Sequence, residues 1–519
     1  MAMPERRCDI LVVGGGLGGV AAALAATARG RSVVMTEPTD WLGGQLTSQA
    51  VPPDEHRWIE RFGCTASYRR LRDGIRVHYR AHFPLTDRAR LEPALNPGAC
   101  TVSRLGHEPR VALAVLHAML APALAEERLH VLLQHAPVRA VADGDRVEAV
   151  TLAGPDGEVT VWADWFLDAT ETGALLPLTG AEHVTGFESR ERTGEPHGPP
   201  EDQPDNLQPV TVCFALEHRA GEDHTIARPP EYERFAGRFS WVAPDPRTLR
   251  PVTRRFEPNP DEDPFSVGPD FDDPDLDKDL WRFRRIAARG LFASGAYPSD
   301  ITLVNWPQID YSDAPVLDGG EAGARALSRS FLHWMQTEAG WPGLRLRGDV
   351  VGDTLDGLAK APYVREARRL RALRTVVEQD IALDVRGHHG AVRFQDAVGV
   401  GHYRIDLHPS TGGDPYIDLA CCPFQLPLGA LVPVRLENLL AAGKAIGTTH
   451  ITNGAYRLHP VEWNAGEAAG HLAAFCHERR TSPRVVCAQP ALLALLQSEL
   501  DAAGVERSWP EAIRAPGNP

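Results

Sequence analysis

The sequence predicts an α/β fold built on a parallel sheet, and three features support this prediction. Residues 8–13 form a short apolar run with no polar face, which is typical of a strand buried in a parallel sheet. A glycine-rich turn, an alanine-rich helix over 20–29 and a second apolar strand over 32–35 complete a βαβ unit. Near the other end, a strand over 439–442 and a strong helix over 462–477 indicate that the chain returns to this sheet.

Composition limits the class of protein. The chain has 519 residues, of which 43% are hydrophobic and 24% charged, values that exclude a disordered, collagen-like or coiled-coil chain. This length predicts two or three domains. The formal net charge of -15 argues against a nucleic-acid partner, because proteins that bind nucleic acids usually present a basic face.

Changes in composition along the chain divide it into four segments. We expect residues 1–185 to form the first part of a nucleotide-binding domain and residues 396–480 to return to it. Between them, residues 186–395 are expected to form an inserted substrate domain, in which the acidic stretch 256–279 makes a solvated loop or lid. Residues 481–519 are expected to form a C-terminal helical tail.

The intervening elements are assigned from periodicity and turn residues. A helix is expected over 104–126, and two further segments, 281–340 and 355–380, also look helical. Strands are expected over 129–133, 138–141, 147–152, 158–163, 165–167, 390–408 and 415–432.

Cysteine usage and the N-terminus favour a reduced, cytoplasmic protein. The eight cysteines contain no CxxC pair, and the adjacent Cys421 and Cys422 are interpreted as buried strand residues in preference to a redox dithiol. The chain enters an apolar strand at once, so we expect no signal peptide, and its longest apolar helical stretch, 111–125, is too short to span a bilayer. His388 and His389 have no partner at zinc-site spacing, so no metal is expected.

The strongest motif is the glycine loop GGGLGG at residues 14–19, between the first strand and the first helix. Gly14 would permit the tight turn, Gly16 would let the backbone approach a pyrophosphate, and Gly19 would let the helix pack closely on the strand. The helix N-terminus would add unpaired N–H groups and the positive end of its dipole. This context predicts a dinucleotide-binding site.

The residues after this loop favour FAD over a nicotinamide nucleotide. Glu37, at the end of the second strand, suits a carboxylate that bonds the adenosine ribose and would repel a 2′-phosphate, which argues against NADP. A second glycine pair, Gly43-Gly44, can pass close to a ligand longer than NAD. Late in the chain, a helix that begins near 460–464 would aim a second N-terminus at the flavin, whose negative charge on reduction it would stabilise.

Five features carry a family resemblance: VVGGGLGG, Glu37, WLGGQLTSQ, LDATETG and AAGKAIGTTHITNGAYRLHPVEWNAGEAAG. Together they resemble the FAD-dependent oxidoreductases of the glutathione-reductase-like superfamily. More narrowly, the chain is similar to a bacterial branch with one dinucleotide-binding domain, sometimes labelled xanthan-lyase-like. The resemblance implies an α/β fold with a Rossmann-like FAD-binding domain and an inserted α+β substrate domain, and FAD held non-covalently.

The resemblance also implies which residues hold FAD. Val138 would meet the adenine through its backbone, and Glu171 stands where a glycine usually follows Ala169-Thr170. Gly443, Asn453 and the backbone near 464–466 would border the ribityl chain and the flavin ring. The full set implied in cofactor binding is Gly14, Gly16, Leu17, Gly18, Gly19, Glu37, Gly44, Gln45, Leu46, Thr47, Val138, Ala169, Thr170, Gly443, Asn453, Asn464 and Gly466.

Candidate catalytic residues lie in the loop that should face the flavin ring. Histidine is the usual acid or base near neutral pH, so His459 is the first candidate for a base or orienting group and His450 the second. Arg457 is a candidate clamp for a substrate carboxylate. His56 follows the glycine pair at a place where some flavoproteins of this superfamily carry a covalent flavin, although a structural role is preferred for it.

The resulting prediction is an enzyme, an FAD-dependent dehydrogenase or oxidase that oxidises a small organic molecule by hydride transfer to flavin N5. Its electron acceptor stays open among oxygen, a quinone and a protein, and a homodimer is left open as the assembly. A flavin monooxygenase that uses NAD(P)H and O2 is the first alternative. An RNA-modifying flavoprotein and a non-catalytic flavin-binding partner are the remaining ones.

Overall fold

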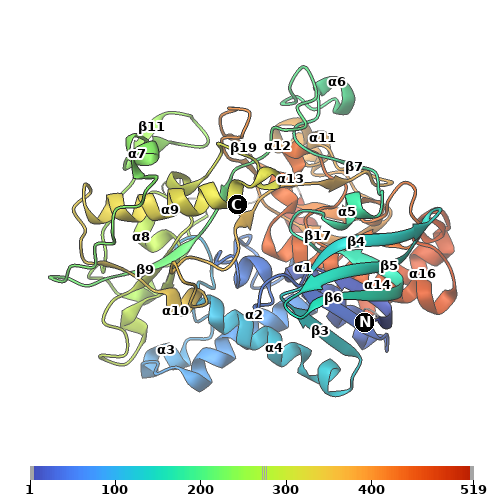
Figure 1. Ribbon diagram of the computed structural model, residues 1–519, viewed down its shortest axis with the longest axis horizontal. Helices are drawn as coiled ribbons and strands as arrows, with labels where there is room; N and C mark the ends of the chain where they lie inside the picture. Colours follow the sequence, from blue (N-terminus) through green and yellow to red (C-terminus); the bar gives the residue numbers. More distant parts are fainter. Residues whose placement is uncertain (1–4, 272, 274, 276, 515–519) are drawn as a thin grey trace.

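The largest sheet of the computed structural model combines strands from residues 5–168 with one strand from residues 439–441, and Figure 1 labels four of its strands, β3 to β6. The structure describes residues 5–271, 273, 275 and 277–514. Neighbouring strands run parallel in the order β3-β2-β1-β6-β21, which confirms the predicted α/β class. Their bounds are β3 (Leu129–Leu133), β2 (Val33–Glu37), β1 (Glu5–Val13), β6 (Gly157–Asp168) and β21 (Leu439–Ala441).

Two antiparallel strands extend this sheet beside the first half of β6. β5 (Arg146–Gly154) pairs with β6, and β4 (Ala136–Asp143) pairs with β5. The expectation of two separate strands over 158–163 and 165–167 was wrong, because the pairing of β6 with β1 continues from Thr160 to Asp168.

Small residues let the helices beside this sheet approach one another closely. α1 (Leu17–Ala28) follows β1 directly and packs against α14 (His459–Arg479), which is buried from His459 to Cys476. α4 (Pro109–Ala125) packs against α2 (Ala66–His82) and also contacts α1. The helix expected over 104–126 is α4, which starts five residues later than expected, at Pro109. Proline is tolerated in the first turn of a helix.

A second sheet occupies the middle of the chain, in the order β12-β13-β9-β14 and antiparallel throughout. Its strands are β12 (Arg285–Ala287), β13 (Ile301–Val304), β9 (Phe214–His218) and β14 (Leu344–Leu346). This sheet and α9 (Gly320–Gln336) share a second hydrophobic cluster, whose residues run from Val210 to Leu358 and include Trp281, Trp306 and Phe331. In Figure 1 this region lies to the left of the first sheet.

Two helical expectations were wrong. Within 281–340 only α9 is a long helix, because Pro298, Pro307 and Pro315 interrupt the chain and the β-branched run of β13 pairs with β9. Residues 355–380 hold the short strands β15 (Tyr363–Val364) and β16 (Arg369–Leu370) and one helical turn, α11 (Glu378–Ile381).

The expected strands over 390–408 and 415–432 are each present as two shorter strands: β17 (Ala397–Gly401), β18 (Ile405–Leu407), β19 (Ile417–Leu419) and β20 (Phe424–Pro427). The remaining elements are α3 (Asp87–Leu91), α5 (Leu175–Leu178), β7 (His183–Val184), α6 (Arg190–Thr193), β8 (Val210–Thr211), α7 (Tyr232–Phe235), β10 (Val242–Pro244), β11 (Pro251–Thr253), α8 (Leu280–Phe283), α10 (Gly348–Val351), α12 (Leu383–Arg386), α13 (His450–Tyr456), α15 (Pro483–Ala488), α16 (Pro490–Ala502) and α17 (Glu511–Arg514).

Ion pairs tie the acidic stretch 256–279 to the rest of the chain. Asp263 pairs with Arg88 at 3.2 Å, and Asp277 pairs with Arg254 at 2.7 Å. Of its ten acidic residues, Asp272 lies outside the described residues.

All eight cysteines are free thiols. No helix in the described ranges is long and apolar enough to cross a bilayer.

Candidate cofactor site

The turn between β1 and α1 is shaped by close backbone contacts. Gly14 has φ +101°, and a Cβ on it would lie 2.3 Å from the Ala169 carbonyl oxygen. A Cβ on Gly19 would lie 1.9 Å from the Gly14 carbonyl oxygen. Only glycine fits at these two positions, so the turn brings the end of β1, the end of β6 and the start of α1 into direct contact.

A cavity of about 530 Å³ opens beside this turn. Its walls come from the turn itself, the ends of β2 and β6, the start of β4, and the segments 44–49 and 360–364. Because β1, β2 and β6 are parallel, their carboxyl ends meet at one edge of the sheet, where open α/β sheets bind their ligands.

Glu37 lines this cavity at the end of β2 and is held in one orientation. One carboxylate oxygen accepts hydrogen bonds from the backbone N–H of Thr39 at 2.9 Å and from its hydroxyl at 2.7 Å. The other oxygen accepts from the Gly15 N–H at 3.2 Å. Burial, with a smaller contribution from the charge of Glu171, outweighs these donors and raises the pKa of Glu37 to about 7.

Lysines gather at this cavity, although lysine is rare in the chain. Lys444 is buried, donates to the Val364 carbonyl oxygen at 2.6 Å and pairs with the Glu171 carboxylate. Lys360 lines the cavity and pairs with Asp40 at 2.9 Å. Lys360 thus lines the cavity, and Lys444 pairs with the lining residue Glu171 without lining the cavity itself. These are two of the chain's three lysines, and the scarcity of lysine among its 54 basic residues is a sequence signal that could have identified them.

Glu171 explains the departure from the usual Ala-Thr-Gly pattern. One of its carboxylate oxygens would lie 3.0 Å from a Cβ on Gly16 and 2.9 Å from a Cβ on Gly44. The carboxylate thus sits between the two glycine turns, where Lys444 balances its charge.

The first turn of α14 adjoins the glycine turn from the other side. The Gly18 N–H donates to Glu462 at 3.4 Å, and the Gln45 amide donates both to Glu462 and to the Arg457 carbonyl oxygen. Burial and the charge of Glu171 raise the pKa of Glu462 to about 7. Gln45 therefore links the second glycine turn to the first turn of α14 and to the loop before it, and Glu462 links both to the start of α1.

A buried network of charges continues inward from Lys444. The Lys444 ammonium lies 5.5 Å from the Tyr363 ring, and the Tyr363 hydroxyl accepts from Arg457. Arg457 also pairs with Asp406 at 3.0 Å. His408 lies between Asp406 and Asp310, and Asp310 pairs with Arg365 at 2.9 Å. The two carboxylates, against burial and the charge of Arg365, raise the pKa of His408 above its ordinary value.

His459, the first residue of α14, belongs to this buried region. Its Nδ1 accepts a hydrogen bond from the Asp54 backbone N–H at 3.1 Å, and its Nε2 has no hydrogen-bond partner in the described part of the chain. Burial and the nearby Arg284, which pairs with Asp54 at 3.1 Å, lower the pKa of His459 well below its ordinary value. The ring is therefore neutral and carries its proton on Nε2.

A comparison with protein families identifies the cofactor. The sequence pattern of the family described as FAD dependent oxidoreductase matches residues 9–500. The chain belongs to this family. It is an FAD-dependent enzyme, as the glycine loop, Glu37 and the second glycine pair indicate. No curated protein sequence matches the chain.

Three solved structures that match the chain are only distantly similar to it. The L-proline dehydrogenase from P. horikoshii is 14% identical with a TM-score of 0.20, over 37% of this chain and 26% of that chain. The OxyS anhydrotetracycline hydroxylase from Streptomyces rimosus is 13% identical with a TM-score of 0.35, over 96% of this chain and 66% of that chain. Mycobacterium smegmatis Sdh1 is 12% identical with a TM-score of 0.22, over 33% of this chain and 35% of that chain. The chain thus spans less than two thirds of the length of each.

The residues at the cavity fit FAD. Gly14, Gly16 and Gly44 present bare backbone to the cavity, and the N-terminus of α1, which begins directly after Gly16, suits a pyrophosphate. Glu37 suits the ribose, and Lys444 supplies a positive charge beside the turns. Gln49 lines the cavity and has a buried amide oxygen without a partner in the described chain, as expected where a ligand completes the hydrogen bonding.

The structure brings only part of the predicted cofactor set to the cavity wall. Leu17, Gly18 and Gly19 form the first turn of α1, behind the wall. The segment 45–47 is buried behind Gly44. Cofactor contacts of all these residues stay a prediction. Those that line the cavity are Gly14, Gly16, Glu37, Gly44, Ala169 and Thr170.

Val138 and the C-terminal members of the set lie elsewhere. Val138 is 37% exposed and outside the cavity, which residues 135–137 line instead. Gly443 packs on Ala169, and Asn453 accepts from the Gln208 amide at 3.4 Å. A Cβ on Gly399 would clash with the Asn464 amide, and a Cβ on Gly466 would clash with the Gly18 carbonyl oxygen. Contacts of these residues with the cofactor stay a prediction.

None of the predicted catalytic residues His459, His450 and Arg457 lines this cavity, and His56 does not line it either. The His450 ring lies 2.8 Å from the Glu366 carboxylate and stacks on Phe187 at 4.2 Å. His56 contacts the Gly63 carbonyl oxygen at 3.0 Å and lies edge-on to Trp509. Neither histidine lines the cavity, so the structural role preferred for His56 suits its surroundings.

Proposed function

We propose that this FAD-dependent enzyme is a dehydrogenase or oxidase that removes a hydride from a small polar organic molecule. Bound FAD supplies the hydride acceptor, flavin N5. The observation that carries the proposal is the buried charged network next to the cofactor cavity. In it, the Nε atoms of Arg284, Arg365 and Arg457 are buried without a hydrogen-bond partner among the described residues. Buried donors are normally paired, so these donors suit a polar substrate that completes them.

His459 is proposed to orient the substrate. Since its Nδ1 accepts from Asp54, its Nε2–H is a donor and suits a substrate hydroxyl or carbonyl oxygen. A neutral ring with so low a pKa is a weak base, and the role of orienting group is therefore preferred over that of base.

Arg457 is proposed to stabilise negative charge that develops during the reaction. Its guanidinium is fixed by Asp406 and the Tyr363 hydroxyl, so no reorganisation is needed when substrate charge changes. His450 is the less favoured candidate, because Glu366 and Phe187 already hold it.

We also propose that the chain represents the glutathione-reductase-like branch with a single dinucleotide-binding domain. The parallel order β3-β2-β1-β6-β21 with the β4-β5 extension supports this assignment. Cys421 and Cys422 are free and buried, and burial raises the thiol pKa of both, which disfavours a dithiol relay as electron acceptor. Oxygen, a quinone or a protein then remains as acceptor.

Anaerobic reduction of the flavin tests the proposed function. Purified holoenzyme is mixed with alcohols, amines and 2-hydroxy acids, and bleaching of its visible bands is followed. We expect at least one class to bleach the flavin without NAD(P)H. His459→Gln and Arg457→Lys should slow the bleaching about 10- to 100-fold, whereas His117→Gln, on the exposed face of α4, should not change it. Bleaching only by NAD(P)H, with labelled oxygen entering the product, would show a monooxygenase instead.

A further inference from the structure

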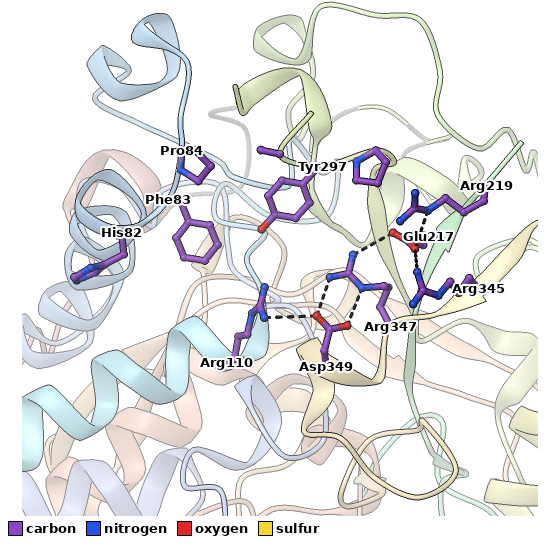
Figure 2. A pocket seen from close by; sticks show the side chains of 12 residues that line it. His82, Phe83, Pro84, Arg110, Glu217, Arg219, Tyr297, Arg345, Arg347 and Asp349 are labelled. Carbon is purple, nitrogen blue, oxygen red and sulfur yellow. Dashed lines mark hydrogen bonds and ion pairs between the residues drawn. The ribbon is translucent and has the colours of Figure 1, made fainter. Parts of the chain in front are cut away.

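A second cavity of about 660 Å³ lies outside the cofactor site (Figure 2). The two cavities share no lining residue. One side of the second cavity comes from the end of α2 and the start of α4, and the other from β9, β14 and the start of α10. It therefore lies where the nucleotide-binding part meets the middle sheet, and nothing in the flavin reaction accounts for its side chains.

Glu217 gathers three arginines on one wall of this cavity. The side chain of Glu217 is fully buried in β9. One of its oxygens accepts from Arg219 Nε at 2.9 Å and from Arg345 Nη1 at 3.1 Å, and the other accepts from Arg347 Nη1 at 3.2 Å. Arg345 stands directly opposite Glu217 in the pairing of β14 with β9. One buried carboxylate thus holds three guanidinium groups together, as Figure 2 shows.

Positive charge exceeds negative charge at this wall. Asp349 pairs with Arg347 at 2.7 Å, and on the facing side Arg110 pairs with Glu108. Four arginines therefore meet three carboxylates, in a chain whose formal net charge is -15. Arg219 and Arg345 carry the excess, because Glu217 is the one side-chain partner of each within the described ranges. Their remaining N–H groups are open to a ligand.

Two aromatic rings face these arginines across the cavity (Figure 2). Phe83 packs on Tyr79 with ring centroids 4.4 Å apart, and Tyr297 packs on Phe292 at 4.3 Å. The Tyr297 hydroxyl also donates to Glu108. Both rings are thereby held in place, and they offer apolar surface opposite a cationic one.

We propose that this cavity binds a small ligand that joins a phosphate group to a flat ring. The phosphate would lie on Arg219 and Arg345, since guanidinium N–H pairs match phosphate oxygens bidentately. The ring would lie against Phe83 and Tyr297. The wall attracts an anion, because two guanidinium groups there share a single carboxylate and leave one net positive charge. The site is separate from the FAD cavity, so the proposal does not depend on the oxidoreductase reaction.

Phenyl phosphate is the probe that matches this description, and phenol and inorganic phosphate are its two halves. Binding to the FAD-loaded protein is measured by titration calorimetry at constant ionic strength. We expect one phenyl phosphate per chain, bound more tightly than either half. Arg219→Ala and Arg345→Ala should each weaken it about tenfold or more, and Arg345→Lys should weaken it less. Arg139→Ala removes the same charge from an exposed pair with Glu158 and should leave binding unchanged.

Three results would overturn the proposal. The first is no heat from phenyl phosphate at millimolar concentration. The second is equal binding by wild type and by Arg219→Ala and Arg345→Ala, provided that both variants keep their bound flavin and melting midpoint. The third is loss of the visible flavin bands on addition of phenyl phosphate, which would place the probe in the FAD cavity. Since Arg345 is half exposed, its variants are expected to fold, and Arg345→Lys supplies the comparison if the alanine variant does not.

Discussion

Gly466 in α14 lies against Gly18 in α1 so closely that a Cβ on Gly466 would stand 1.9 Å from the Gly18 carbonyl oxygen. One turn further along, a Cβ on Gly470 would stand 2.4 Å from the Ala22 carbonyl oxygen. The two helices therefore meet backbone to backbone. This contact brings Glu462 to the glycine turn, and it accounts for the glycine at position 466 without a contact to the flavin.

Gly466→Ala should destabilise the protein and weaken its hold on FAD. The added methyl group forces α14 away from α1, and overpacking of this kind costs about 1–3 kcal/mol. The melting midpoint and the flavin content after gel filtration should both fall. Gly237→Ala is the matched control, because a Cβ at that position meets nothing within 4 Å. Equal melting midpoints for the two variants would contradict the close helix contact.

FAD affinity should rise as pH rises through about 7. Burial raises the pKa of Glu37 to about 7, so much of this carboxyl is protonated at pH 6 in the FAD-free protein. Ribose hydroxyls donate to the ionised form, so binding releases a proton, and affinity falls by up to about tenfold per pH unit below 7. Titration of apoprotein by flavin fluorescence from pH 6 to pH 8 measures this slope.

Glu37→Gln should flatten that slope, because glutamine keeps the shape and loses the titrating group. It should also weaken FAD binding about tenfold at pH 8. Glu462→Gln belongs in the same series, since burial and Glu171 raise the pKa of Glu462 to about 7 as well. The pH dependence of FAD affinity could instead persist in Glu37→Gln and disappear in Glu462→Gln. That result would show that the released proton comes from Glu462, and it would contradict the contact between Glu37 and the ribose.

Lys444→Met should weaken FAD binding about tenfold or more. The variant removes a buried ammonium and leaves the Glu171 carboxylate uncompensated beside the glycine turns. Adding Glu171→Gln to Lys444→Met should restore part of the affinity, because the remaining negative charge is then gone. The double-mutant cycle is measured by FAD titration of apoprotein, with Lys278→Met in the acidic stretch as the control. Strictly additive effects would argue that the pair does not act as a unit at the cofactor.

The adenine wall can be tested by adding bulk at two nearby positions. Ala136 lines the cavity and Val138 does not. Ala136→Phe should therefore weaken FAD binding at least about tenfold by filling the space, whereas Val138→Phe should leave it unchanged. The reverse ranking in a fluorescence titration would restore Val138 as the adenine neighbour.

Local sequence was enough to predict the first half of the candidate cofactor site. The glycine loop, the helix after it and Glu37 fall within one βαβ unit of about thirty residues, so their spacing already determines their geometry. Val138 was implied by the family resemblance alone, and it lies outside the cavity that residues 135–137 line, so its contact with adenine stays a prediction. The pairing of β4 with β5 is irregular between Pro137 and Arg139, next to this position, and strand periodicity alone does not predict such an irregularity.

The sequence by itself determined the α/β class, the dinucleotide loop and the FAD cofactor, because strand periodicity and turn glycines are short-range properties. Only the tertiary structure decided that Lys444 meets Glu171 and that Glu217 gathers Arg219, Arg345 and Arg347. Lys444 and Glu171 come from segments far apart in the chain, as do Glu217 and Arg345. Their partnership depends on strand register and helix packing, which bring distant residues together only after the whole chain has folded.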